Sequence, residues 1–308
     1  MSAVELFEDF FFIQRDFLTG NHFVCRGPEP ALIDTGFIAD TERTLDLIRD
    51  LGADPARVGR IVNTHTHYDH CGANRVIQDR SGCEILLSVT GKHFMDTRDD
   101  WAMWWRYHEA PDGYFHCARG IEDGETVRIG RYEFEARCTP GHAGDLLVLY
   151  NRKHRLLISS DTLWENDMAM INVRVEGSRA LFCQLESLDR LAGLDAALVC
   201  PGHGRPFTDA GAAIDRARTR VRRFLAHPEK LGADTVKKIL VYSLLTRGPI
   251  EAEAFEAECL ASNWFRETVD LYFDGRYESM YRRTLEGLAG RGLIQRDGTR
   301  IYSALMTS

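Results

Sequence analysis

Three histidines and an aspartate occur within six positions of one short stretch, Thr64–Gly72. Imidazole and carboxylate ligands together suit zinc, iron or manganese better than calcium or magnesium. His65 and His67 are two positions apart, so an extended backbone directs both side chains to the same side, and Asp69 and His70 can face a second ion at the following turn. Because one metal needs three protein ligands and an open position for water, this number of candidates predicts a site for two metals. The alternative is a polar loop with incidental histidines, since short motifs also occur by chance.

The same stretch resembles the H-x-H-x-D-H signature of the metallo-β-lactamase superfamily. Four further segments resemble the strand-and-ligand segments of that family in the same order, namely Ala31–Gly36, Cys138–His142, Ile158–Thr162 and Val199–Gly204. The resemblance spans about residues 10 to 207. It implies an α/β fold, the αββα metallo-β-lactamase sandwich.

The resemblance also implies roles for seven side chains. It assigns one metal to His65, His67 and His142, the other to Asp69, His70 and His203, and the bridging position to Asp161. Asp69 and Asp161 are the implied catalytic residues, because Asp69 can orient a hydroxide that two ions share. The implied cofactors are two divalent transition-metal ions, zinc in the first place, with iron or manganese as alternatives.

The elements that must position these residues are short strands that alternate with helices. Each ligand candidate follows a short apolar run that reads as a strand, and the apolar positions of Thr41–Leu51 have helical spacing. This alternation is typical of a layered α/β sandwich. Asp34 ends an early strand, where it either supports the metal loop from behind, as in the family, or caps a turn.

We expect residues 1–227 to form the catalytic domain, with an aromatic insert at about residues 90–124. If the insert is helical, positions 101, 104, 105 and 108 share one face. The insert either packs on the core as an amphipathic helix or forms a wall of the substrate pocket. The candidate pocket residues are Trp101, Trp104, Trp105 and Tyr107.

Residues 228–308 are expected to form a small, mainly helical C-terminal domain. Its last strands surround an Asp297–Gly298 turn, and helices followed by such a hairpin resemble a winged-helix domain. Its acidic and basic residues are about balanced, so we interpret it as a packing or dimerisation module rather than a nucleic-acid reader. A homodimer is one assembly that this interpretation allows.

The composition limits the classes of partner and compartment. The 308 residues carry a net charge of −8, which argues against general binding to nucleic acid or to an anionic membrane. The eight cysteines include no C-x-x-C pair and read as reduced thiols, so we expect a cytoplasmic protein. No apolar run approaches the length of a membrane span, and the N-terminus does not read as a signal peptide.

The expected function is that of a metal-dependent hydrolase similar to glyoxalase II or the lactonases. Such an enzyme would use a hydroxide held by two metals to cleave an ester, thioester or lactone of a small molecule. One alternative is an RNase Z-like phosphodiesterase or nuclease, which the low basicity disfavours. Another is an iron-dependent oxygenase of the persulfide dioxygenase type, which needs fewer ligands than this chain offers.

Overall fold

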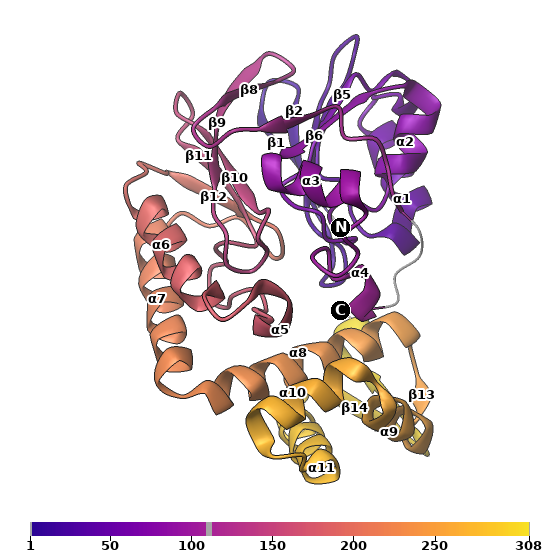
Figure 1. Ribbon diagram of the computed structural model, residues 1–308. Helices are drawn as coiled ribbons and strands as arrows, with labels where there is room; N and C mark the ends of the chain where they lie inside the picture. The colour runs from indigo at the N-terminus through magenta and orange to yellow at the C-terminus, as the bar shows by residue number, and fades with distance from the viewer. Residues whose placement is uncertain (1, 109–112, 308) are drawn as a thin grey trace. The chain divides into compact units, whose positions relative to one another are not determined.

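A computed structural model describes residues 2–108 and 113–307, and the chain forms two compact units in it, Met1–Val221 and Arg222–Ser308 (Figure 1). The division falls within helix α7 (Ala210–Ala226), whereas the sequence suggested a boundary after residue 227. The first unit contains every candidate metal ligand.

The first sheet of this unit has seven strands, which lie side by side in chain order. Its first four strands are antiparallel neighbours, and the last four run parallel to one another. The strands are β1 (Ser2–Phe7), β2 (Phe10–Gln14), β3 (His22–Cys25), β4 (Ala31–Ile33), β5 (Arg60–Val62), β6 (Glu84–Ser88) and β7 (Arg119–Ile121).

The second sheet has five strands in the order β12, β11, β10, β9, β8. All its neighbours are antiparallel except β11 and β12. The strands are β8 (Thr126–Ile129), β9 (Tyr132–Cys138), β10 (Leu147–Asn151), β11 (Leu156–Ser160) and β12 (Leu198–Pro201). Every residue of β10 and β11 is buried, which agrees with their continuous apolar runs, because both faces of this sheet are covered.

Helices cover the outer face of each sheet, while the inner faces pack on one another. The shared core contains Phe12 and Ile33 from the first sheet and Leu149 from the second. Helices α1 (Thr41–Asp50) and α2 (Asn74–Ser81) pack on the outer face of the first sheet, and α6 (Ala180–Ala192) and α7 pack on that of the second (Figure 1). These four layers confirm the expected αββα sandwich.

The aromatic insert is not one helix. Helix α3 (Val89–Thr97) is followed by turns and by the short helix α4 (Trp105–His108), and residues 109–112 lie outside the described residues. Trp104 has φ +64°, a left-handed conformation that cannot continue a right-handed helix and that is rare for a bulky side chain. The predicted common helical face for positions 101 to 108 is therefore wrong.

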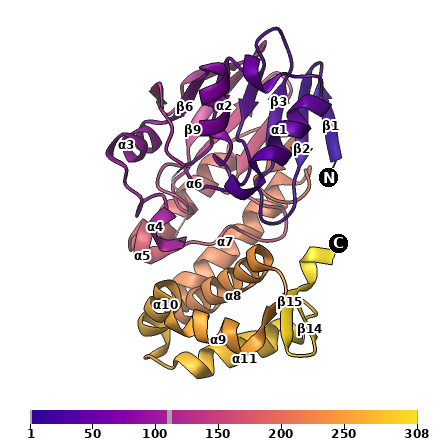
Figure 2. The same ribbon diagram turned by 90° about the vertical axis from the view of Figure 1, so that its right-hand side faces the viewer.

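After the end of α7, the described residues of the second unit form the helices α8 to α11 and a three-stranded sheet of order β13, β15, β14 (Figure 2). Its helices are α8 (Pro228–Arg247), α9 (Ala252–Ala261), α10 (Asn263–Phe273) and α11 (Tyr277–Ala289), and its strands are β13 (Ile250–Glu251), β14 (Ile294–Asp297) and β15 (Arg300–Ser303). Short helical turns complete the chain at α5 (Val173–Glu176), η1 (Ile38–Asp40), η2 (Pro55–Arg57) and η3 (Ala304–Thr307). None of the described helices is long and apolar enough to cross a membrane.

Candidate metal centre

The seven candidate ligands come together at the ends of strands from both sheets. The H-x-H-x-D-H loop follows β5, and the other three ligands follow strands of the second sheet, β9, β11 and β12. Their ligand atoms form three overlapping groups that could hold metal ions, in each of which all atoms lie within 4.8 Å of one another. The groups are His65–His67–His142, His65–His70–Asp161 and Asp69–His70–His203.

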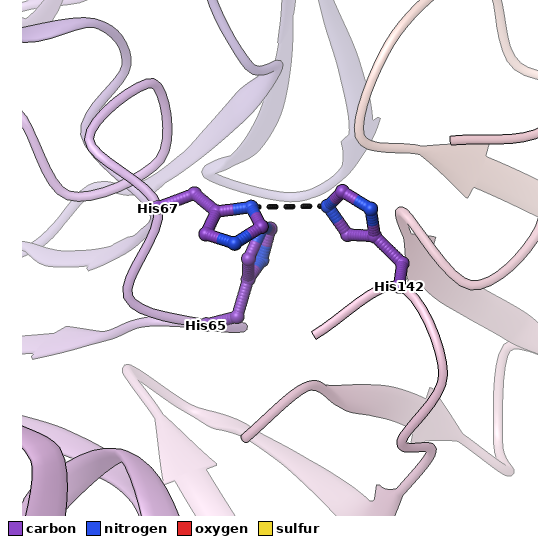
Figure 3. Close-up of side chains that lie close together, drawn as sticks. All are labelled: His65, His67 and His142. Atoms are coloured by element: carbon purple, nitrogen blue, oxygen red, sulfur yellow. Dashed lines mark hydrogen bonds between the residues drawn. The ribbon is translucent and has the colours of Figure 1, made fainter. Parts of the chain in front are cut away.

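The first group consists of three imidazole rings that converge from two loops (Figure 3). His67 Nδ1 lies 3.1 Å from His65 Nε2 and 3.0 Å from His142 Nε2. The far nitrogens of the outer rings are engaged elsewhere, because His65 Nδ1 faces Thr64 Oγ1 at 3.1 Å and His142 Nδ1 donates to the Met170 carbonyl at 2.6 Å. Both Nε2 atoms therefore present lone pairs, and a single proton on His67 Nδ1 cannot satisfy the two. A cation fits between these three nitrogens.

The Asp69–His70–His203 group, called the second ligand group from here on, lies beside the carboxylate of Asp161. Asp69 Oδ2 lies 3.2 Å from His203 Nε2 and 3.9 Å from His70 Nε2. The buried His70 Nε2 has no hydrogen-bond partner among the described residues, and it faces Asp161 Oδ2 at 3.5 Å. Its orientation suits a metal ion that Asp69 and Asp161 also contact.

Asp161 stands between the two groups. Its Oδ2 atom lies 3.4 Å from His142 Nε2 of the first group and 3.8 Å from His203 Nε2 of the second. Gly202 makes room for this carboxylate, because a Cβ atom on Gly202 would collide with Asp161 Oδ1. The glycine before His203 is thus needed for the close approach of the two ligand loops.

Two buried aspartates fix the backbone and the tautomers of the histidine loop. Asp34 Oδ2 accepts hydrogen bonds from His70 Nδ1 at 2.9 Å and Thr64 Oγ1 at 2.8 Å, and its Oδ1 accepts the Thr64 N–H at 2.8 Å. Asp145 Oδ2 accepts the N–H of Thr66 at 2.9 Å. Asp34 therefore orients the ligands from behind, as partners of metal-binding histidines commonly do, and this settles the alternative of a simple turn cap.

The pKa shifts separate the two groups electrostatically. Burial lowers the pKa of His65, His67 and His142, so these rings are neutral, as ligation requires. Burial alone would raise the pKa of Asp69, but His70 and His203 hold it at about 2. Burial would likewise lower the pKa of His70, but Asp69, Asp161 and Asp34 raise it well above 6.5. The ligand group around Asp69 and Asp161 therefore attracts positive charge.

Of the four predicted pocket residues, Trp104 has its ring against the candidate ligands. The Trp104 ring centroid lies 4.5 Å from that of His67 and 5.4 Å from that of His142, and its Nε1 donates to Glu176 Oε1 at 2.6 Å. Trp105 is buried in a cluster with Met95, Met103 and Cys117 and donates to the Thr66 carbonyl. Trp101 and Tyr107 pack edge to face on each other at 5.7 Å.

The sequence did not single out three residues that contact the centre or its surroundings. Trp164 Nε1 donates to Asp161 Oδ1 at 3.0 Å, and its ring lies 5.3 Å from that of His203. The Phe17 ring lies 6.3 Å from the same histidine and is 41% exposed. Glu176 supports Trp104 from 72 positions away. Only Trp164 had a local signal, because it follows Asp161 by three positions.

Two proteins that are similar to this chain in sequence are named for different activities. It is 29% identical over 168 residues to a hydroxyacylglutathione hydrolase of Polaromonas sp. (strain JS666 / ATCC BAA-500), a match that covers 53% of this chain and 54% of that protein. It is 26% identical over 136 residues to the mitochondrial persulfide dioxygenase of Homo sapiens, which covers 44% of this chain and 43% of that protein. The matches thus span about half the length of these two relatives.

The comparison of folds and of family patterns identifies the superfamily. A metallo-beta-lactamase family protein from Thermus thermophilus has a similar structure, with a TM-score of 0.58 and 22% sequence identity, over 97% of this chain and 100% of that one. The pattern of the family described as the metallo-beta-lactamase superfamily matches residues 22–203, which is more than half of the sequence. The chain therefore belongs to the metallo-β-lactamase superfamily.

Proposed function

We propose that this protein is a hydrolase with two metal ions that cleaves an ester, thioester or lactone of a small molecule. The observation that carries this proposal is the position of Asp161 Oδ2, which faces histidines of both ligand groups at 3.4 to 3.8 Å. A carboxylate oxygen between two ligand groups suits a pair of ions rather than one.

The residues divide the work as follows. His65, His67 and His142 would hold one ion, and Asp69, His70 and His203 would hold the other. Asp161, whose Oδ2 faces histidines of both groups, would contribute to both sites. When bound, a pair of divalent ions lowers the pKa of a water molecule and polarises the scissile carbonyl. Asp69 remains ionised at neutral pH, because its pKa is about 2, so it can orient the attacking water by accepting its hydrogen bond.

The aromatic residues around the ligands favour a small substrate with an apolar part. Trp104 lies against the first ligand group, and Trp164 and the exposed Phe17 lie against His203 of the second. Aromatic rings bury much apolar area, and pockets are lined mainly by such groups. The net charge of −8 disfavours a nucleic-acid substrate.

The relative named persulfide dioxygenase supports a second candidate, an iron-dependent oxygenase that acts on a persulfide. This activity needs one iron and fewer ligands, so the second ligand group of Asp69, His70 and His203 would have no metal. The two candidates differ in metal content and in oxygen use.

The test combines elemental analysis with a substrate panel. Protein purified without added metal should contain about two transition-metal ions per chain, and it should hydrolyse at least one thioester, ester or lactone. Asp161→Asn should remove most of that activity, whereas Asp54→Asn, which changes an exposed turn cap in the same unit, should not. One iron per chain with oxygen uptake on an organic persulfide would replace this proposal by the second candidate, and hydrolysis of phosphodiesters alone would replace it by a nuclease.

A further inference from the structure

The two oxygens of Asp161 have different surroundings. Oδ2 faces three imidazole nitrogens, those of His70, His142 and His203, at 3.4 to 3.8 Å. Oδ1 instead accepts the indole N–H of Trp164 at 3.0 Å and lies against Gly202. The carboxylate is therefore held so that a single oxygen points between the two ligand groups.

Trp164 is well placed to maintain this orientation. It lies in the segment that follows β11, only three positions after Asp161, so the hydrogen bond closes a short loop. Its ring is tilted by 58° against that of His203 at a centroid distance of 5.3 Å, and the side chain is half-buried. An indole N–H is a donor only, so the Trp164 nitrogen cannot serve as a metal ligand.

We propose that Trp164 is a positioning residue for the metal centre, which reserves Asp161 Oδ2 as the one oxygen that both ions share. This inference rests on the proposed function. A carboxylate with two unoccupied oxygens can bind one ion with both of them. The hydrogen bond from Trp164 occupies Oδ1, which disfavours that alternative and keeps Oδ2 available to the second ion.

The decisive substitution is Trp164→Phe, which keeps an aromatic ring against His203 and removes only the donor. We expect the metal-free variant to keep its circular dichroism spectrum and to bind the second ion about tenfold or more weakly in a titration against a chelating dye. Trp101→Phe is the matched control, because Trp101 packs on Tyr107 instead of a ligand, and it should bind both ions as the wild type does. Wild-type affinity for both ions in Trp164→Phe would overturn the proposal.

A double-mutant cycle shows whether the effect passes through Asp161. In an Asp161→Asn background the bridging oxygen is already altered, so adding Trp164→Phe should change metal affinity less than twofold. A loss as large as in the wild-type background would mean that Trp164 acts by another route. A wild-type chain that binds no metal would overturn both this proposal and the proposed function, whereas intact wild-type binding with an unaffected Trp164→Phe variant would overturn this proposal alone.

A measurement on the unchanged protein covers the case in which Trp164→Phe does not fold. The indole N–H resonance of Trp164 should exchange slowly with solvent, and it should shift when zinc is added, because the Asp161 carboxylate that accepts its hydrogen bond on Oδ1 would then hold metal through Oδ2. The indole resonance of Trp264, in the second unit, serves as the internal reference and should not shift. Exchange of the Trp164 proton at the rate of an exposed indole would contradict the proposed hydrogen bond.

Discussion

Asparagine has nearly the same shape as aspartate, and Asp34→Asn should weaken metal binding at both candidate ligand groups. Asp34 accepts hydrogen bonds from His70 Nδ1 and Thr64 Oγ1 on one oxygen and from the Thr64 N–H on the other. The Thr64 N–H cannot reverse its direction, so the new amide group should face His70 and the hydroxyl. His70 must then carry its proton on Nε2, the atom that faces the ligand carboxylates.

The same substitution should reach His65 through Thr64. In the wild type the Thr64 hydroxyl donates to Asp34. In the variant it would accept from the asparagine amide and could donate to His65 Nδ1, which lies 3.1 Å away. That would move the His65 proton to Nε2, the atom that faces His67 Nδ1 within the His65–His67–His142 group. One amide therefore favours the wrong tautomer in a ligand of each ion.

The expected loss of metal affinity and of stability follows from the hydrogen bonds that Asp34 makes. Removal of a partner that orients a metal-binding histidine typically weakens metal affinity about 10–100-fold, so each ion should bind weaker by roughly that factor. Loss of a hydrogen bond to a charged group costs about 1.5–3 kcal/mol in the free energy of unfolding. Asparagine tolerates the φ of +55° at this position, so the backbone should add little to that cost.

The assay is a competition titration of the metal-free protein with a chelating dye, together with urea unfolding. Asp54→Asn, an exchange of the same kind at an exposed turn, is the control and should leave both measurements unchanged. If Asp34→Asn bound two ions with wild-type affinity, control of the histidine tautomers by Asp34 would be refuted.

Three further outcomes follow from contacts around the centre. Burial raises the pKa of Glu176 to about 8 from 4.5. Between these pH values the unfolded chain releases a proton that the folded chain retains, so the free energy of unfolding should fall as the pH rises. Glu176→Gln should reduce this fall in urea titrations of the metal-free protein, and an unchanged pH profile would contradict the raised pKa of Glu176. Trp104→Phe should raise KM severalfold with little change in kcat, because the ring loses its hydrogen bond to Glu176. Trp105→Phe, which removes a hydrogen bond to the Thr66 carbonyl, should lower the free energy of unfolding and leave KM unchanged. A metal at 100 times its Kd contributes about 2.7 kcal/mol to the free energy of unfolding, so chelation should lower the unfolding temperature of the first unit. An unchanged unfolding temperature would mean that no ion is bound.

The placement of the candidate ligands at the ends of strands could be predicted from the sequence because its signal is local. Each candidate ligand follows a strand, and strands of a buried sheet read as short apolar runs such as Leu156–Ser160. The layers of the sandwich follow from the alternation of such runs with amphipathic segments such as Thr41–Asp50. Two strands gave weaker signals: Ser2–Phe7 is an edge strand in which none of residues 3–7 is buried, and Ile250–Glu251 has only two residues.

The surroundings of the ligands could not be predicted in the same way, because they depend on pairs far apart in the chain. The spacing of Trp101, Trp104 and Trp105 suggested one helical face, but the left-handed backbone at Trp104 turns its ring onto His67 and leaves Trp105 in the core. Glu176, the hydrogen-bond partner of Trp104, lies in a segment with no periodic pattern. No spacing rule relates these positions, so only the folded chain brings them together.

The segment between β11 and α6 connects these separate observations. Trp164 bonds to Asp161, the Met170 carbonyl accepts from His142, and Glu176 anchors Trp104 over His67. A single stretch of chain thus contacts two candidate ligands, Asp161 and His142, and the Trp104 ring that lies against a third, His67. Because its contacts are hydrogen bonds to particular atoms, small changes in this segment should alter metal affinity and substrate preference together, while the sheets that carry the ligands remain unchanged.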